Sequence, residues 1–138
     1  MYDLLTSKSG FGSPRENVWL SIDAQATTAN FKKSFDEVLV DRARPQDVAV
    51  LFYAGHGSQT KDLNGDEPDQ WDETLMLQDA RSDGQHDLVD DELFTMLGRL
   101  HTKTKNIVMI LDSCNSGTAT RGDGTQVARF FEPDPNGD

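Results

Sequence analysis

The chain has 138 residues, of which 36% are hydrophobic, and its formal net charge is -11. This length suits one compact domain, and no apolar run approaches the ~18 residues that a membrane-spanning helix needs. The acidic balance argues against nucleic acid as a partner and favours cations, either metal ions or basic peptides.

The first part of the chain predicts a helix, a strand and a second helix. Residues 1–8 are expected to end a helix, and VWLSI at 18–22 is expected to form a short strand. Apolar residues at helical spacing within 31–39 predict the second helix, with Thr27 or Thr28 as its cap.

Pro45 is expected to end that second helix. The continuous apolar run at 48–55 then predicts a central strand that is buried on both faces. Residues 75–78 are expected to form a short hairpin arm, and IVMIL at 107–111 predicts a second, fully apolar strand.

The last predicted helix precedes that second apolar strand and covers residues 88–100. Asp90 or Asp91 is expected near its cap. The residues expected on its apolar side are Leu93, Phe94, Leu97 and Leu100.

Alternating helices and strands favour an α/β fold with a parallel sheet. In such sheets ligands bind at the carboxyl ends of the strands. His56 and Cys114 each follow an apolar strand closely, so both are expected at the same edge. A histidine within hydrogen-bonding reach can activate a thiol, and flanking glycines such as Gly55 and Gly57 leave backbone amides free to face an oxyanion.

Each of these two residues also has an ordinary structural interpretation. A lone cysteine at a strand end is usually a small buried apolar residue, and a lone histidine in a glycine turn is usually a surface residue. The matching contexts of His56 and Cys114 favour a functional pair. Cys114 is the only cysteine, so no internal disulfide is expected, and with no signal peptide apparent at the amino terminus this predicts a cytoplasmic location.

The negative charge is concentrated in residues 62–92, which hold twelve acidic side chains against one basic side chain, Arg81. A solvated loop is the simplest interpretation. An EF-hand calcium loop is an alternative, because Asp62, Asn64, Asp66 and Glu73 fall at its ligand positions. That alternative is disfavoured, because Glu67 stands where the loop needs glycine and no helix clearly enters it.

Four motifs together carry a specific resemblance: FYAGHGSQ, NGDEPDQWDETL, VDDEL and LDSCNSGT. They resemble the caspase-like cysteine peptidases of the metacaspase and orthocaspase type. In caspases the histidine precedes the cysteine by roughly 50 residues, and here it precedes it by 58. The resemblance covers residues 1–121, with an acidic loop at 61–74, and residues 122–138 are expected to be a flexible inter-subunit linker.

The fold that this resemblance implies is a caspase-like three-layer sandwich, with a mostly parallel central sheet flanked by helices. The chain corresponds to the large-subunit, p20-like portion. The family's first strand and its small-subunit strands are expected to lie outside this chain. A small-subunit chain is therefore an expected partner that would supply the missing strands.

The resemblance also implies catalytic roles. Cys114 corresponds to the nucleophile and His56 to the general base and acid, with the amides of Gly57 and Cys114 as the oxyanion hole. Asp112 corresponds to an acidic residue of the substrate-binding pocket, which implies cleavage of peptides and proteins after Arg or Lys. Ala54 stands in that pocket where the family usually has serine, which weakens the expected preference.

Calcium activation and self-processing are two further implications of the family resemblance. The carboxylates that correspond to calcium ligands are Asp72, Asp90, Asp91 and Asp123. No organic cofactor is expected. Arg121 is the expected self-cleavage site, with Arg129 second, because both lie in a polar tail just after the nucleophile.

The sequence leaves two other classes of function open. The first is a truncated fragment or pseudo-enzyme that has the peptidase fold and acts by binding without turnover. The second is a calcium-binding module in which Cys114 has no catalytic role.

Overall fold

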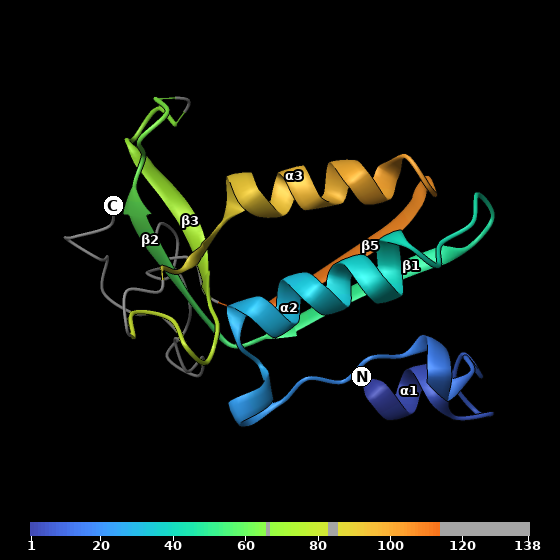
Figure 1. Ribbon diagram of the computed structural model, residues 1–138. Coiled ribbons are helices and arrows are strands. Elements are labelled where there is room, and N and C mark those ends of the chain that lie inside the picture. Colours follow the sequence, from blue (N-terminus) through green and yellow to red (C-terminus); the bar gives the residue numbers. More distant parts are fainter. Residues whose placement is uncertain (66, 83–85, 114–138) are drawn as a thin grey trace, which may run out of the picture.

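The computed structural model describes residues 1–65, 67–82 and 86–113. The chain begins with α1 (Tyr2–Thr6) and two 3-10 turns, η1 (Arg15–Asn17) and η2 (Asp23–Gln25). Next come helix α2 (Thr28–Ser34) and the π-helical turn η3 (Phe35–Val40). The remaining elements are β1 (Val48–Ala54), β2 (His56–Lys61), β3 (Trp71–Met76), β4 (Leu88–Val89), α3 (Asp90–His101) and β5 (Asn106–Asp112) (Figure 1).

The described strands form two sheets, so the fold is mixed α/β. In the first, β1 and β5 pair in parallel, from Val48 opposite Asn106 to Ala54 opposite Asp112. The prediction that these two strands are parallel neighbours is therefore confirmed. In the second sheet β2, β3 and β4 pair antiparallel.

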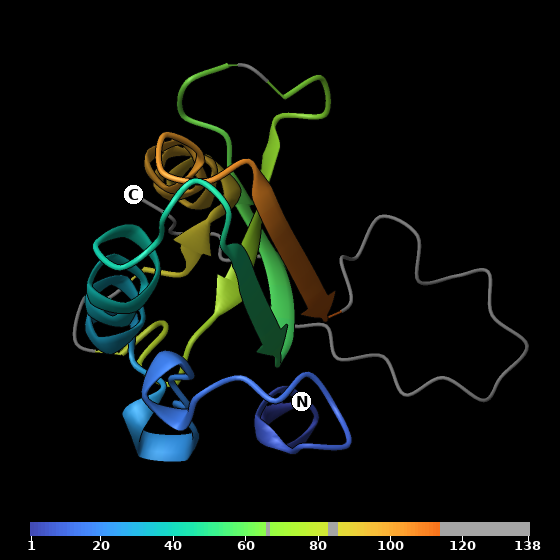
Figure 2. The ribbon, with the colours of Figure 1, turned by 90° about the vertical axis from the view of Figure 1, so that its right-hand side faces the viewer.

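Helices α2 and α3 lie on the same face of the β1–β5 sheet (Figure 2). Phe35 is buried there together with Met96 and Leu100 of α3, and partly buried Leu51 and Ile107 from the two strands pack against them. Side chains of a strand alternate between its two faces. This face therefore holds the core.

The opposite face of the β1–β5 sheet is open in the described part of the chain. Val48 is 63% exposed, Phe52 39% and Val108 43%. The prediction that the first apolar run is buried on both faces is wrong for Val48 and Phe52. The three-layer arrangement is correspondingly only partly visible, as one helical layer against the sheet.

Helix α2 starts where the sequence predicts, since the Thr27 side chain accepts a hydrogen bond from the Asn30 amide at 3.2 Å. The Thr28 amide and hydroxyl both donate to Asp79, at 2.8 and 3.1 Å. The expected strand at 18–22 is not present. Val18 and Ile22 have extended backbones, but no described strand pairs with them.

Helix α3 has Asp90 and Asp91 next to its cap, as predicted. Val89 is the cap, and the two carboxylates occupy the first turn, where the positive end of the helix dipole stabilises their charges. Phe94 is 77% exposed, so its predicted place on the apolar side is wrong. Met96, which the spacing argument omitted, is 3% exposed and belongs to the core.

The acidic loop joins two strands, because β2 enters it and β3 leaves it. An EF-hand needs helices on both sides of its loop, so this alternative is wrong. Of the predicted short arm at 75–78, residues 75 and 76 are the end of the longer strand β3, and its partner β2 was not predicted. None of the helices in the described ranges is both long and apolar enough to cross a membrane.

Candidate active site

His56 lies at the rim formed by the carboxyl ends of β1 and β5. It is the first residue of β2 and is exposed. The residue before it, Gly55, donates its amide to the Asp112 carbonyl at 3.2 Å, which extends the β1–β5 pairing by one step. The turn that carries His56 is therefore attached to the last residue of β5.

Cys114 lies outside the described residues, as do Asp123, Arg121 and Arg129. The chain leading to Cys114 is described as far as Ser113. Strand β5 ends at Asp112, two positions before Cys114. The sulfur-to-imidazole distance is therefore not part of the described geometry. What is described is that both residues follow neighbouring parallel strands at the same end.

The two predicted substrate-binding residues are brought together by the sheet. Ala54 and Asp112 are register partners in the last β1–β5 pair. Both are exposed, so Asp112 is not the buried carboxylate that would bind an arginine side chain most strongly. Gly57, predicted to supply an oxyanion-hole amide, is buried in β2.

Tyr53, which the sequence analysis did not single out, supports the turn around His56. Its hydroxyl lies 2.8 Å from the His56 carbonyl oxygen and 2.7 Å from that of Met76. Burial, together with the nearby Asp87 charge, raises the pKa of Tyr53 to about 12. The phenol is thus a neutral hydrogen-bond donor over the physiological range.

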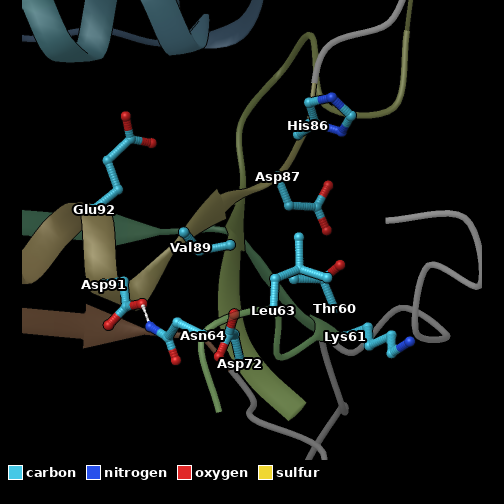
Figure 3. Close-up of a pocket in the computed structure, with 10 residues that line it drawn as sticks. All are labelled: Thr60, Lys61, Leu63, Asn64, Asp72, His86, Asp87, Val89, Asp91 and Glu92. Carbon is cyan, nitrogen blue, oxygen red and sulfur yellow. Dashed lines mark hydrogen bonds between the residues drawn. The ribbon is translucent and has the colours of Figure 1, made fainter. Parts of the chain in front are cut away.

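Two of the predicted calcium ligands line a cavity of about 290 Å³ beside the acidic loop (Figure 3). Asp72, in β3, is only 7% exposed. Asp91, from the first turn of α3, accepts a hydrogen bond from the side-chain amide of Asn64. The cavity therefore collects oxygen atoms from the hairpin and from the helix.

The third predicted ligand, Asp90, lies with a different set of carboxylates. Oxygens of Asp90, Glu67 and Glu73 are all within 4.8 Å of one another, and this is the one such group of three found in the described part of the chain. Burial, followed by the charges of Glu73 and Asp91, raises the pKa of Asp90. The acidic side chains are thus present, but Asp72, Asp90 and Asp91 do not form a single set.

A buried ion pair holds the three-stranded sheet beside this region. Arg81 donates to Asp87 at 2.8 Å and to the Ser58 hydroxyl at 2.6 Å. Thr74 also donates to Asp87, at 3.0 Å. Because Ser58 belongs to β2 and Thr74 to β3, the ion pair joins both strands to the segment that enters β4.

Comparison with known proteins decides the family. The model of the metacaspase, peptidase C14 domain matches residues 1–121. The chain belongs to the metacaspase family. This confirms the resemblance on which the catalytic roles depend.

Fungal metacaspases are among its relatives. The chain is 38% identical over 115 residues to metacaspase-1A of Aspergillus oryzae, which covers 79% of this chain and 27% of that protein. It is 40% identical over 96 residues to metacaspase-1 of Coccidioides immitis, which covers 70% of this chain and 20% of that protein. This metacaspase chain therefore spans less than a third of the length of either relative.

A solved structure also resembles the metacaspase chain. It is the crystal structure of a protein from Geobacter sulfurreducens, with a TM-score of 0.54 and 32% sequence identity. The match covers 71% of this chain and 34% of that chain. It supports the mixed α/β arrangement of helices and parallel strands.

Proposed function

We propose that this metacaspase chain carries the catalytic pair of a cysteine endopeptidase. The Cys114 thiolate attacks the scissile carbonyl carbon, and His56 gives a proton to the departing amine. Water then hydrolyses the acyl-enzyme, with His56 acting as the base. The observation that carries this proposal is the Gly55–Asp112 hydrogen bond, which links the turn before His56 to the strand before Cys114.

The proposed cleavage follows an Arg or Lys residue. Asp112 and Ala54 lie side by side at the end of the β1–β5 sheet, directly beside the turn of His56. A carboxylate at that position favours a cationic side chain over a neutral or anionic one. Because Asp112 is exposed, we expect a preference for Arg and Lys over Asp without strong discrimination between the two cations.

A peptide that ends in an arginine ketone tests the catalytic proposal. The chain is expected to become labelled at one site, Cys114, and His56→Ala is expected to slow labelling by about 10²–10⁴-fold, which is typical of a lost general base. His101→Ala, an exposed position at the end of α3, is the matched control and should label at the wild-type rate. Labelling that is unaffected by His56→Ala would instead indicate a fold that binds without turnover.

We also propose calcium as an activating ion, held by acidic side chains of the β2–β3 hairpin and of the first turn of α3. Asp72, Asp90 and Asp91 are the proposed ligands, with Asp123 a fourth from the tail. Hard carboxylate oxygens are the ligands that calcium prefers, and roughly six to eight are needed. The cation would favour the charged form of Asp90, whose pKa is raised by burial and then by the charges of Glu73 and Asp91.

Calorimetry tests the calcium proposal without depending on activity. Wild-type chain should release or absorb heat on addition of calcium, and Asp90→Asn should remove most of that signal. Asp41→Asn, an exposed residue outside the cluster, should leave it unchanged. The absence of any heat at millimolar calcium would reject the site.

Self-processing after Arg121, and secondarily after Arg129, is proposed from the position of these residues just beyond the nucleophile. Mass spectrometry of chain incubated with calcium should find a new carboxyl terminus at Arg121. Cys114→Ala should remain intact. A chain that cleaves a peptide substrate while its own segment 115–138 stays uncut would contradict self-processing.

A small-subunit chain that supplies the missing strands is the proposed partner, and we expect it also to cover the open face of the β1–β5 sheet. Val48, Phe52 and Val108 expose apolar side chains there, and such patches on soluble domains are usually covered. The chain alone is expected to bind an apolar dye at this face, and Phe52→Ser should reduce that binding.

The single cysteine supports a reducing, cytoplasmic location.

A further inference from the structure

Tyr53 belongs to β1, the strand that leads to His56, and its side chain reaches β3, the strand that pairs with His56. Its hydroxyl lies 2.8 Å from the His56 carbonyl oxygen and 2.7 Å from the Met76 carbonyl oxygen. His56 and Met76 are register partners at one end of the β2–β3 pairing. A phenol has one proton to donate, so the two carbonyls share it. The hydroxyl thus joins the backbone of His56 to the next strand.

The core holds the ring of Tyr53 in place. Its side chain is 9% exposed and belongs to a buried apolar cluster with Leu75, Leu77, Leu88 and Leu93. A tyrosine has few rotatable bonds, and a packed ring has little freedom to move. The hydroxyl is therefore a fixed point against which the backbone of His56 is set.

Gly55 makes this contact possible. A Cβ atom on Gly55 would lie 2.4 Å from the Tyr53 hydroxyl oxygen, so the phenol occupies the space that a side chain would need. The Gly55 amide in turn donates to Asp112 at 3.2 Å. The turn before His56 is therefore held on one side by the phenol and on the other by the end of β5.

We propose that Tyr53 is a positioning residue for His56, acting through the backbone carbonyl of His56 to hold the imidazole beside the carboxyl end of β5. It does not itself contact the substrate in this proposal. The inference rests on the proposed function of His56 and Cys114. It adds a residue from the core whose removal should change the chemistry at the rim.

Tyr53→Phe tests this role, because it removes one oxygen atom and keeps the ring. The concentration of active sites is first determined by labelling with the arginine ketone. We expect kcat per labelled site on an arginyl peptide to fall about 3- to 10-fold, as for the loss of one hydrogen bond. KM should stay within about twofold, and the pH profile of kcat/KM should shift. Tyr2→Phe, at the only other tyrosine, is the matched control.

A merely structural role predicts a different result. Tyr53→Phe would then yield fewer labelled sites, each with wild-type kcat and a wild-type pH profile. That result would overturn the inference. His56→Ala and Cys114→Ala separate this outcome from a failure of the proposed function. The proposed function is wrong if wild type shows no turnover, or if either variant turns over at the wild-type rate.

A second variant keeps the test valid if Tyr53→Phe does not fold. Difluorotyrosine incorporated into the Tyr2→Phe chain retains the hydroxyl but makes the phenol more acidic. As the pH rises this phenol loses its donor proton before an ordinary one does. We expect kcat per site to fall at a lower pH than in the unsubstituted chain, and coincident profiles would contradict the inference.

Discussion

Gly55 is the residue of the His56 turn with the least freedom to change. A Cβ atom there would lie 2.4 Å from the Tyr53 hydroxyl oxygen and 2.6 Å from the ring carbon that bears it. The ring is packed in the core and has nowhere to withdraw. The glycine is therefore required by a neighbouring side chain and not by an unusual backbone angle.

Gly55→Ala is expected to destabilise the chain by about 1–3 kcal/mol, the usual cost of overpacking. Gly98→Ala is the matched control, because a Cβ on Gly98 in α3 meets nothing within 4 Å. There alanine should stabilise the chain by about 0.5–1 kcal/mol, since glycine disfavours a helix interior. Urea unfolding of both variants checks the opposite signs, and equal stabilities would contradict the packing described for Gly55.

Ionisation of Tyr53 predicts a loss of stability at alkaline pH. Its pKa in the folded chain is raised to about 12 from an ordinary 10.0, mainly by burial. The folded state therefore favours the neutral phenol, and this stabilising contribution is complete below pH 10 and is lost as the pH rises towards 12. Urea midpoints should fall more steeply over this range in wild type than in Tyr53→Phe, whereas parallel decreases would show that the phenol ionises freely.

At the scale of a whole element, Asp62 holds the loop of the β2–β3 hairpin. Its Oδ1 accepts from the amides of Asn64 and Gly65 at 2.9 and 2.6 Å, and its Oδ2 accepts from the Glu67 amide at 3.1 Å. The Gly65 amide is the main cause of a lowered Asp62 pKa, and burial acts in the opposite direction. The carboxylate thus organises the loop through its backbone, independently of any metal ion.

Acid should loosen this loop before it unfolds the sheets. Because the folded pKa of Asp62 is below the ordinary 3.8, its contribution is present above that pH and is lost as the pH falls through the lower folded value. At neutral pH, Asp62→Asn should retain two of the three hydrogen bonds and Asp62→Ala none. Amide exchange in the loop should therefore be slowest in wild type and fastest in Asp62→Ala, and equal rates would contradict this role.

The ion pair of Arg81 and Asp87 stabilises the three-stranded sheet. The Asp87 side chain is 3% exposed and that of Arg81 is 24% exposed. Asp87→Ala should destabilise the chain by about 2–4 kcal/mol, because it removes the buried carboxylate to which both Arg81 and Thr74 donate. Thermal unfolding checks this, with Asp41→Ala, at an exposed position, as a control that should change little. An Asp87→Ala chain as stable as that control would show that the Arg81–Asp87 pair contributes nothing to the stability of the chain.

Sequence patterns predicted the elements that are built on apolar spacing. The regular spacing within 31–39 predicted α2, and the continuous apolar runs predicted β1 and β5. Strand β2 was missed because it reads HGSQTK, with no apolar side chain, and its buried Gly57 and Ser58 are held by strand pairing and by Arg81. For 18–22 the error was the reverse, because a strand was predicted and none is present. Strand-forming residues also need a neighbouring strand to pair with.

In the candidate site, too, features carried by short motifs were predictable, and contacts between residues far apart in the chain were not. The motifs around His56 and Cys114 were visible as short stretches, and their shared rim followed from the rule for parallel strands. The role of Tyr53 was not visible, because it depends on Met76, which is 23 positions away. The separation of Asp90 from Asp72 was equally hidden, since strand and helix geometry set it, and spacing along the chain does not reveal it.

For the molecule as a whole, the account depends on two parallel strands that end at one rim. The antiparallel sheet begins at that rim, because His56 is the first residue of β2, and the acidic loop lies at the other end of the β2–β3 pairing. Helices α2 and α3 cover one face of the β1–β5 sheet (Figure 2). The proposed chemistry requires only that His56 and Cys114 meet there. Because Cys114 is the only cysteine, its thiol can be followed alone in the intact chain.

The pH dependence of alkylation of Cys114 by iodoacetamide tests most directly whether the His56 imidazole interacts with the Cys114 thiol. A cysteine without an activating neighbour has a pKa of about 8.5, and one paired with a histidine has a lower value. We predict a lowered thiol pKa in wild type and in His101→Gln, with a return towards about 8.5 in His56→Gln. A thiol whose alkylation profile is the same with and without the His56 imidazole would contradict the account.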